Sequence, residues 1–203
     1  MQSKFWLILE WLILFIAFPL FVFSEWLHIS RFVLFAPPIL YALWHERNNL
    51  GYDGPIKPVG YSVGLRIILI ISLIFSSAYW WLPKHFLHLP LHRPQLWIVI
   101  MLFYPFVSAL PQEILYRQFY FRRYKILWPT PNLMITSNIA SFALLHIVYD
   151  NWIAIFFTLI GGAFFTISYQ RTQDLRWSWL EHSLYGLAIF TSGWGRFFYE
   201  PTG

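Results

Sequence analysis

Four ionisable side chains lie inside strongly apolar segments of this chain. Glu113 and Arg117 share one segment, His146 lies in the next, and His182 lies in a third, near the C-terminus. A charge at the centre of a bilayer costs roughly 2.5–3.5 kcal/mol on insertion scales, so residues of this kind usually face a partner or a cavity. Three separate segments therefore supply polar groups that could meet at one interior site.

These residue types are the components of a hydrolytic centre. A carboxylate and an imidazole can take a proton from water, and a cation or a hydrogen-bond donor can stabilise an oxyanion. Glu113 and Arg117 are four residues apart, which places them one turn apart on the same face of a helix. The simpler alternative is a structural ion pair, with each histidine bonded to a neighbouring carbonyl. Two histidines in other apolar segments favour the hydrolytic interpretation.

A metal site is the competing interpretation of the same side chains. Glu113, His146 and His182 would form a set of two histidines and one carboxylate, which suits zinc. The helical H-E-x-x-H signature is absent, because His45-Glu46 is followed by Asn49 where the second histidine should stand. The ligands could still come from separate helices, so a divalent metal such as zinc stays open. The chain has no cysteine, which excludes thiolate ligands, disulfides and cysteine nucleophiles.

The segments that must position these residues have the composition of membrane spans. The 203 residues are 58% hydrophobic and 11% charged, whereas soluble domains carry roughly 25% charged residues. Apolar runs near the length of a span, about 17–25 residues, cover residues 5–24, 30–45, 64–82, 95–121, 132–149, 152–170 and 177–195. We expect an all-α, polytopic transmembrane helical bundle of about seven spans. It would be a single integral membrane domain over residues 1–203, with the motif-bearing core at about 95–195.

The basic balance of the chain is best explained by membrane topology. The net charge is +5, and loop lysines and arginines set the orientation of spans. With the N-terminus in the cytoplasm, cytoplasmic segments would carry Lys4, Arg47, Lys57, Arg66, Arg122, Arg123, Lys125, Arg171 and Arg176, and the opposite side Arg31, Lys84, Arg93 and Arg196. This excess predicts a cytoplasmic N-terminus, with lipid rather than nucleic acid as the partner. The first run, Phe5 to Phe23, ends in bulky residues and is expected to be a retained span instead of a signal peptide.

Three short motifs follow one another along the later spans. They read Gln112-Glu113-Ile114-Leu115-Tyr116-Arg117, Phe142-Ala143-Leu144-Leu145-His146 and His182-Ser183-Leu184-Tyr185-Gly186. In order and spacing they resemble E-E-x-x-x-R, F-x-x-x-H and H-x-x-x-N of the CPBP family of intramembrane proteases. That family includes the type II CAAX prenyl endopeptidases and bacterial relatives linked to bacteriocin self-immunity. The resemblance covers the C-terminal half of the chain. The earlier spans resemble the family only in being apolar segments.

The resemblance implies an intramembrane endopeptidase that hydrolyses a peptide bond in a membrane-associated protein or peptide. Its cavity would lie between the fourth, fifth and seventh spans, and the bacterial members imply an inner membrane. Glu113 would be the base or a metal ligand, and His146 would help to activate water. Arg117 would orient Glu113 or stabilise negative charge, His182 would be an oxyanion donor or a ligand, and Gln112 would position the water.

Two residues depart from the family motifs. Gln112 stands where the first glutamate is expected, and glutamine cannot accept a proton at neutral pH. Gly186 stands where the third motif has asparagine, which removes a side-chain donor. Either Glu113 takes over as base, or the chain is a weak or inactive member that acts as a membrane scaffold or immunity factor. A small transporter would predict inverted repeats, which the sequence lacks.

Overall fold

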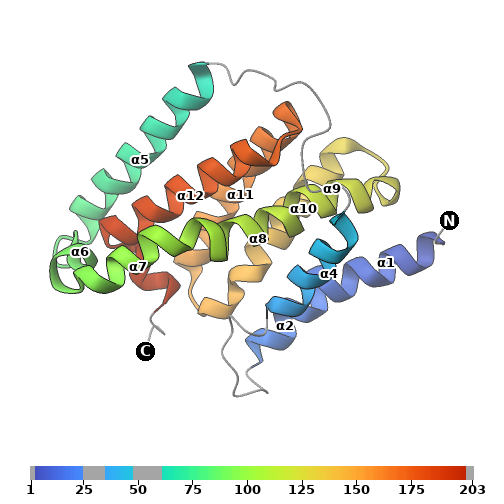
Figure 1. Ribbon diagram of the computed structural model, residues 1–203, viewed down its shortest axis with the longest axis horizontal. Coiled ribbons are helices and arrows are strands. Elements are labelled where there is room, and N and C mark those ends of the chain that lie inside the picture. Colours follow the sequence, from blue (N-terminus) through green and yellow to red (C-terminus); the bar gives the residue numbers. More distant parts are fainter. Residues whose placement is uncertain (1–2, 25–34, 48–60, 200–203) are drawn as a thin grey trace.

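The computed structural model describes residues 3–24, 35–47 and 61–199, and within these ranges it contains helices and short connections but no β-strand. The long helices run roughly antiparallel between the upper right and the lower left of the view in Figure 1. Turns between successive helices lie at the two ends of this bundle. The prediction of an all-α helical bundle is confirmed.

Five helical segments of the described chain are long and apolar enough to cross a membrane, and they correspond to the first, third, fourth, fifth and sixth predicted spans. They are Lys4–Phe23, Val63–Trp81, Pro94–Arg123, Pro131–Tyr149 and Trp152–Thr172. Their outward faces carry large apolar side chains, of which Leu65, Trp80 and Trp81 are 69%, 76% and 74% exposed. An apolar surface of this extent marks a lipid-facing protein. The chain is therefore an integral membrane protein.

These segments are built from shorter elements in chain order. The first comprises α1 (Lys4–Leu12), η1 (Ile13–Ala17) and α2 (Phe18–Phe23), and the second lies in α5 (Tyr61–Trp81). The third comprises α7 (Pro94–Tyr104), η2 (Pro105–Ala109), α8 (Leu110–Glu113), η3 (Ile114–Phe119) and α9 (Tyr120–Arg123). The last two are α10 (Pro131–Leu145) with η5 (His146–Tyr149), and α11 (Trp152–Thr172). Outside them lie α4 (Ala36–Glu46), α6 (His88–His92), η4 (Lys125–Leu127), α12 (Leu175–Ser192) and η6 (Trp194–Phe198).

The predicted count of seven spans is not confirmed. The second predicted span corresponds to α4, whose 11 residues reach only about 16 Å at 1.5 Å per residue, whereas the bilayer core is roughly 30 Å thick. Residues 30–34 of that prediction lie outside the described residues. The seventh corresponds to α12, which has 18 residues but is not among the helices apolar enough to cross by composition.

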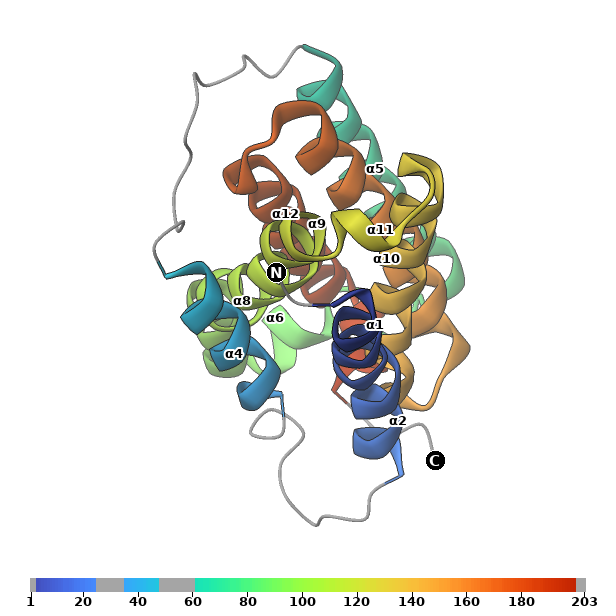
Figure 2. The same cartoon turned by 90° about the vertical axis from the view of Figure 1, so that its right-hand side faces the viewer.

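The polar character of α12 follows from its position at the centre of the bundle. It packs against α5, α7 and α11, and Figures 1 and 2 show it surrounded by these helices. Arg66 of α5 donates to Glu181 Oε1 from Nη2 at 2.6 Å and from Nε at 2.9 Å. Ser168 and Tyr185 also donate to the Glu181 carboxylate. A helix whose polar groups are bonded by its neighbours need not be apolar on every face.

The segment from α7 to α9 contains two π-helical turns, η2 and η3. Pro105 and Pro111 lack a backbone N–H, and their rings exclude the carbonyl four residues earlier, so a regular α-helix cannot pass through them. The disruption takes the form of these wider turns. Turns of this kind often accompany functional sites, and every residue of η3 is buried.

A side-chain cap begins α12 immediately after α11. Asp174 accepts a hydrogen bond from the backbone N–H of Arg176 at 2.9 Å and from the Arg176 side chain. Burial raises the pKa of Asp174, but the hydrogen bonds and charge of Arg176 outweigh this effect, and the pKa of this carboxyl lies below its usual value. Because the folded-state pKa is depressed, the cap stabilises the protein above the unfolded-state value and weakens as the pH falls through the folded-state value.

Replacing Asp174 with alanine is expected to lower the free energy of unfolding by about 1 kcal/mol at neutral pH, the usual contribution of an N-cap. Asp174→Ser should keep most of the cap but remove the titrating carboxyl. The free energy of unfolding of this variant should therefore change less between neutral pH and pH 3 than that of the wild type. Unfolding in mixed detergent micelles across this range measures both effects. Equal pH dependence in the wild type and Asp174→Ser would contradict the assignment.

Candidate functional site

The ionisable residues of the three motifs come from the central helix and two of its neighbours. Glu113 ends α8, Arg117 lies in η3, His146 begins η5, and His182 lies in the first half of α12. Glu113 and Arg117 are 0% exposed, and His146 and His182 are 7% and 5% exposed. None of the four points outward at lipid.

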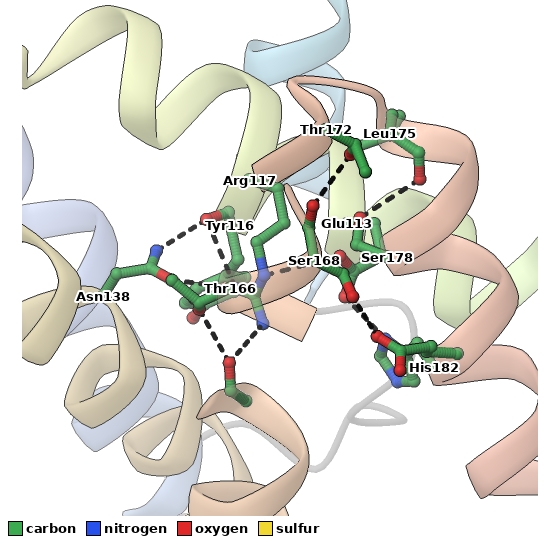
Figure 3. Close-up of polar contacts among 12 residues, drawn as sticks. Glu113, Tyr116, Arg117, Asn138, Thr166, Ser168, Thr172, Leu175, Ser178 and His182 are labelled. Atoms are coloured by element: carbon green, nitrogen blue, oxygen red, sulfur yellow. Dashed lines mark hydrogen bonds and ion pairs between the residues drawn. The ribbon is translucent and has the colours of Figure 1, made fainter. Parts of the chain in front are cut away.

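The structure joins the first and third motifs by a direct hydrogen bond. His182 Nδ1 lies 2.8 Å from Glu113 Oε1, between residues that are 69 positions apart (Figure 3). A carboxylate can only accept, so Nδ1 of His182 carries the proton. The remaining ring nitrogen, Nε2, bonds no described residue. The Phe165 ring stacks on the His182 ring with centroids 4.6 Å apart, which fixes the plane of the imidazole.

Arg117 lies behind this pair and neutralises it. Its Nε is 3.4 Å from Glu113 Oε2, close enough for an ion pair although not aligned as a hydrogen bond. Nη1 donates to Asn138 Oδ1 at 3.1 Å, and Nη2 donates to the Gly162 carbonyl at 3.4 Å. The guanidinium also lies over the Phe142 ring at 4.9 Å. The charge of Arg117 is therefore shared among α8, α10 and α11.

Asn138 and Thr166 complete the surroundings of Arg117, and sequence reasoning missed both. Thr166 donates to Asn138 Oδ1 at 2.9 Å, and the Asn138 amide donates to the Tyr116 carbonyl at 2.6 Å. Figure 3 shows this network on the side of Arg117 away from His182. The position of Asn138 inside the apolar run 132–149, away from its ends, is the signal that could have identified it.

His146 is held by its own helix. Its Nδ1 lies 2.9 Å from the carbonyl oxygen of Phe142, one turn earlier. A carbonyl can only accept, so Nδ1 donates and Nε2 keeps its lone pair. The Phe142 ring contacts both histidines, with ring centroids 4.9 Å from His146 and 5.6 Å from His182. Both imidazoles therefore have the same tautomer and pack on the same aromatic ring.

A cavity of about 660 Å³ connects these groups. Gln112, His146 and His182 line it, together with aliphatic and aromatic side chains from α5, α7, α11 and α12. Glu113 and Arg117 are not among its lining residues and lie behind His182. Sequence reasoning predicted the contributions of the fourth, fifth and seventh segments, but it missed the walls supplied by α5 and α11.

Gln112 places one polar atom at this cavity without a partner. Its Nε2 donates to Ser108 Oγ at 3.0 Å, while its buried Oε1 accepts no hydrogen bond from the described residues. A buried acceptor without a donor costs about 1–3 kcal/mol. An orphaned acceptor beside two histidines is consistent with a site that is completed by a donor such as water.

The side chains proposed for zinc do not form a metal site in this arrangement. In the described parts of the chain, no group of three or more His, Asp or Glu side chains is placed to hold a metal ion. Glu113 Oε1 is instead bonded directly to His182. The set of Glu113, His146 and His182 as metal ligands therefore stays a prediction from sequence.

A comparison with protein families finds a match over the part of the chain that contains this site. Residues 94–188 match the type II CAAX prenyl endopeptidase Rce1-like family. The matched region begins with α7 and ends within α12, so it includes all three motifs. No curated protein and no solved structure matched the chain.

Proposed function

Residues 94–188 match the Rce1-like family of type II CAAX prenyl endopeptidases, and from this premise we propose that the chain hydrolyses peptide bonds in membrane-associated proteins or peptides with a water activated by His182. The observation that carries the proposal is the hydrogen bond between Glu113 and His182 at the wall of a cavity that His146 also lines. The remaining residues have roles that follow from this pair.

His182 is the proposed general base. Its Nδ1–H is donated to Glu113, so the lone pair on Nε2 is available to a water in the cavity. Glu113 does not line the cavity and acts as a positioning residue, because it fixes the tautomer of His182 and stabilises the imidazolium that forms. This assignment exchanges the roles expected from sequence, in which Glu113 was the base and His182 the donor.

Either His146 or Gln112 orients the same water in this proposal. Nε2 of His146 and Oε1 of Gln112 are both acceptors without a described partner, and both residues line the cavity. Water donates two hydrogen bonds, so one acceptor can orient it while His182 removes the other proton. Arg117 stays behind Glu113 and keeps its carboxylate ionised in a water-poor environment.

The cavity favours a substrate segment that is itself apolar. Most of its lining residues are aliphatic or aromatic, and its volume of about 660 Å³ is within the usual range of about 300–1,000 Å³ for ligand sites. Exclusion of bulk water from such a cavity strengthens each electrostatic interaction inside it. The peptide would enter as an extended, lipid-embedded segment with its scissile carbonyl near His182.

An inactive scaffold or immunity factor is the second candidate function, and Gln112 is the observation that favours it. Gln112→Glu is expected to distinguish the two, because it adds a carboxylate at the cavity wall beside the His182–Glu113 pair. In an enzyme it should change kcat by about tenfold or more, since a general base contributes about 10²–10⁴, and should add an ionisation to the pH–rate profile. Cleavage of a membrane-anchored fluorogenic peptide in proteoliposomes measures both.

Gln95→Glu is the matched control, because it makes the same change on the exposed start of α7. It should leave the rate and its pH profile as in the wild type. If neither the wild type nor Gln112→Glu cleaves any of a panel of membrane-anchored peptides, the scaffold assignment replaces the proteolytic one.

A further inference from the structure

Tyr104 fills the space beside Gly186 on the cavity wall. Gly186 lies one turn after His182 in α12, and both line the cavity with Tyr104 of α7. A Cβ atom built on Gly186 would overlap the ring and the hydroxyl oxygen of Tyr104. Any side chain at position 186 would therefore force Tyr104 to move.

The Tyr104 hydroxyl is a donor without an acceptor. None of the hydrogen bonds among the described residues involves it, whereas the hydroxyl of Tyr185, also at the cavity, donates to Glu181 at 3.1 Å. The Tyr104 ring lies edge-on to the His182 ring, with centroids 6.1 Å apart, and edge-on to Phe190 at 5.4 Å. Packing thus holds a partnerless O–H next to the proposed base.

Hydrolysis needs a donor of this kind at the cavity. Attack by water places negative charge on the carbonyl oxygen, and a preorganised donor at that point is usually the largest single contribution to such a reaction. Arg117 is behind Glu113, with its Nη groups bonded to Asn138 and Gly162. His182 has no proton on Nε2 before it acts as base. Tyr104 is therefore the best-placed neutral donor beside His182.

We propose that Tyr104 is a further catalytic residue, whose hydroxyl donates a hydrogen bond to the oxyanion; this inference rests on the proposed proteolytic function. The water oxygen bonds to the carbonyl carbon, its proton passes to His182 Nε2, and the π electrons of the C=O bond move onto the oxygen that Tyr104 contacts. The C=O bond then re-forms as the C–N bond breaks, and His182 returns the proton to the amine nitrogen. The products are a carboxylic acid and an amine, and both residues are regenerated.

Tyr104→Phe tests the proposal because it removes only the hydroxyl. It is expected to lower kcat by about 10²-fold, the order of effect of losing one oxyanion donor, with KM unchanged. Tyr79→Phe is the matched control: it also removes a phenol hydroxyl, but on the exposed face of α5 and outside the cavity, and kcat should stay near the wild-type value. Wild-type kcat in Tyr104→Phe would overturn the role of Tyr104 while leaving the proteolytic function intact.

Gly186→Ala provides a second measurement that does not alter the tyrosine itself. The added methyl group displaces the Tyr104 ring, so kcat should again fall by about 10²-fold. In the double variant the two losses should not add, because each removes the same interaction. Additive losses would overturn the proposal. If the wild-type protein cleaves no substrate while it is folded, the proposed function and this inference fail together.

Discussion

Replacing His182 with alanine is expected to lower kcat for cleavage of a membrane-anchored peptide by about 10³-fold or more. General-base catalysis contributes about 10²–10⁴, and this substitution also removes the hydrogen bond that His182 donates to Glu113. The fold should persist, since α12 is held by the bonds of Arg66 to Glu181 and by its packing on α11. Single-turnover cleavage in proteoliposomes separates the chemical step from substrate binding.

Imidazole added to the buffer gives this prediction a sharper form. His182→Ala leaves a space at the cavity wall in which Glu113 faces the missing ring, so free imidazole should restore part of the rate. His92→Ala is the control, because His92 lies exposed on α6, away from the motifs. Unchanged cleavage in His182→Ala would exclude His182 as the base. A loss of rate that imidazole cannot restore, together with a changed melting temperature, would indicate a structural role.

Arg117→Ala is expected to lower the free energy of unfolding by about 3–5 kcal/mol, the cost of breaking a buried ion pair by removing one partner. Glu113 would be left as an uncompensated charge at 0% exposure. The bonds to Asn138 Oδ1 and the Gly162 carbonyl would also be lost. Equilibrium unfolding in mixed detergent micelles gives the magnitude directly.

Two comparisons identify the cause of that loss. Arg171→Ala removes an exposed arginine at the end of α11 and should change stability by less than about 0.5 kcal/mol. Glu113→Gln in the Arg117→Ala background should recover part of the stability, because the unpaired charge is then absent. If Arg117→Ala unfolds like Arg171→Ala, the Arg117 network does not hold the bundle together.

The sequence motifs predicted which segments supply the site, but they did not predict how its side chains are arranged. Glu113 and His182 were expected near one another because both are ionisable groups in apolar helices, and the structure places them 2.8 Å apart. The motifs could not predict that His182 lines the cavity and Glu113 does not, because spacing along the chain does not give the direction of the Glu113 side chain at the end of α8. Tyr104 carried no signal, since one tyrosine in a chain with 12 does not stand out.

The hydropathy count of about seven spans exceeds the five found among the described residues for a physical reason. Hydropathy identifies segments that lipid can solvate, but a helix enclosed by other helices is solvated by protein. The buried residues of α12 include Ser178, Glu181 and His182. Its place in the bundle therefore depends on bonds to α5 and α11, and hydropathy averaged along the chain does not include contacts between helices. Similarly, α4 lies against η3, and its apolar composition suits that contact as well as it suits lipid.

The two carboxylate oxygens of Glu113 face in different directions, with Oε1 toward His182 and Oε2 toward Arg117. Under the proposed mechanism Glu113 serves both turnover and folding, so a lineage that gives up catalysis would still be under selection to keep it. The side chains of Gln112 and Tyr104 make no comparable ion pair with a buried residue. Drift after loss of activity should accordingly appear first at these two positions, and retention of Glu113 in a descendant would say little about whether that descendant still cuts peptides.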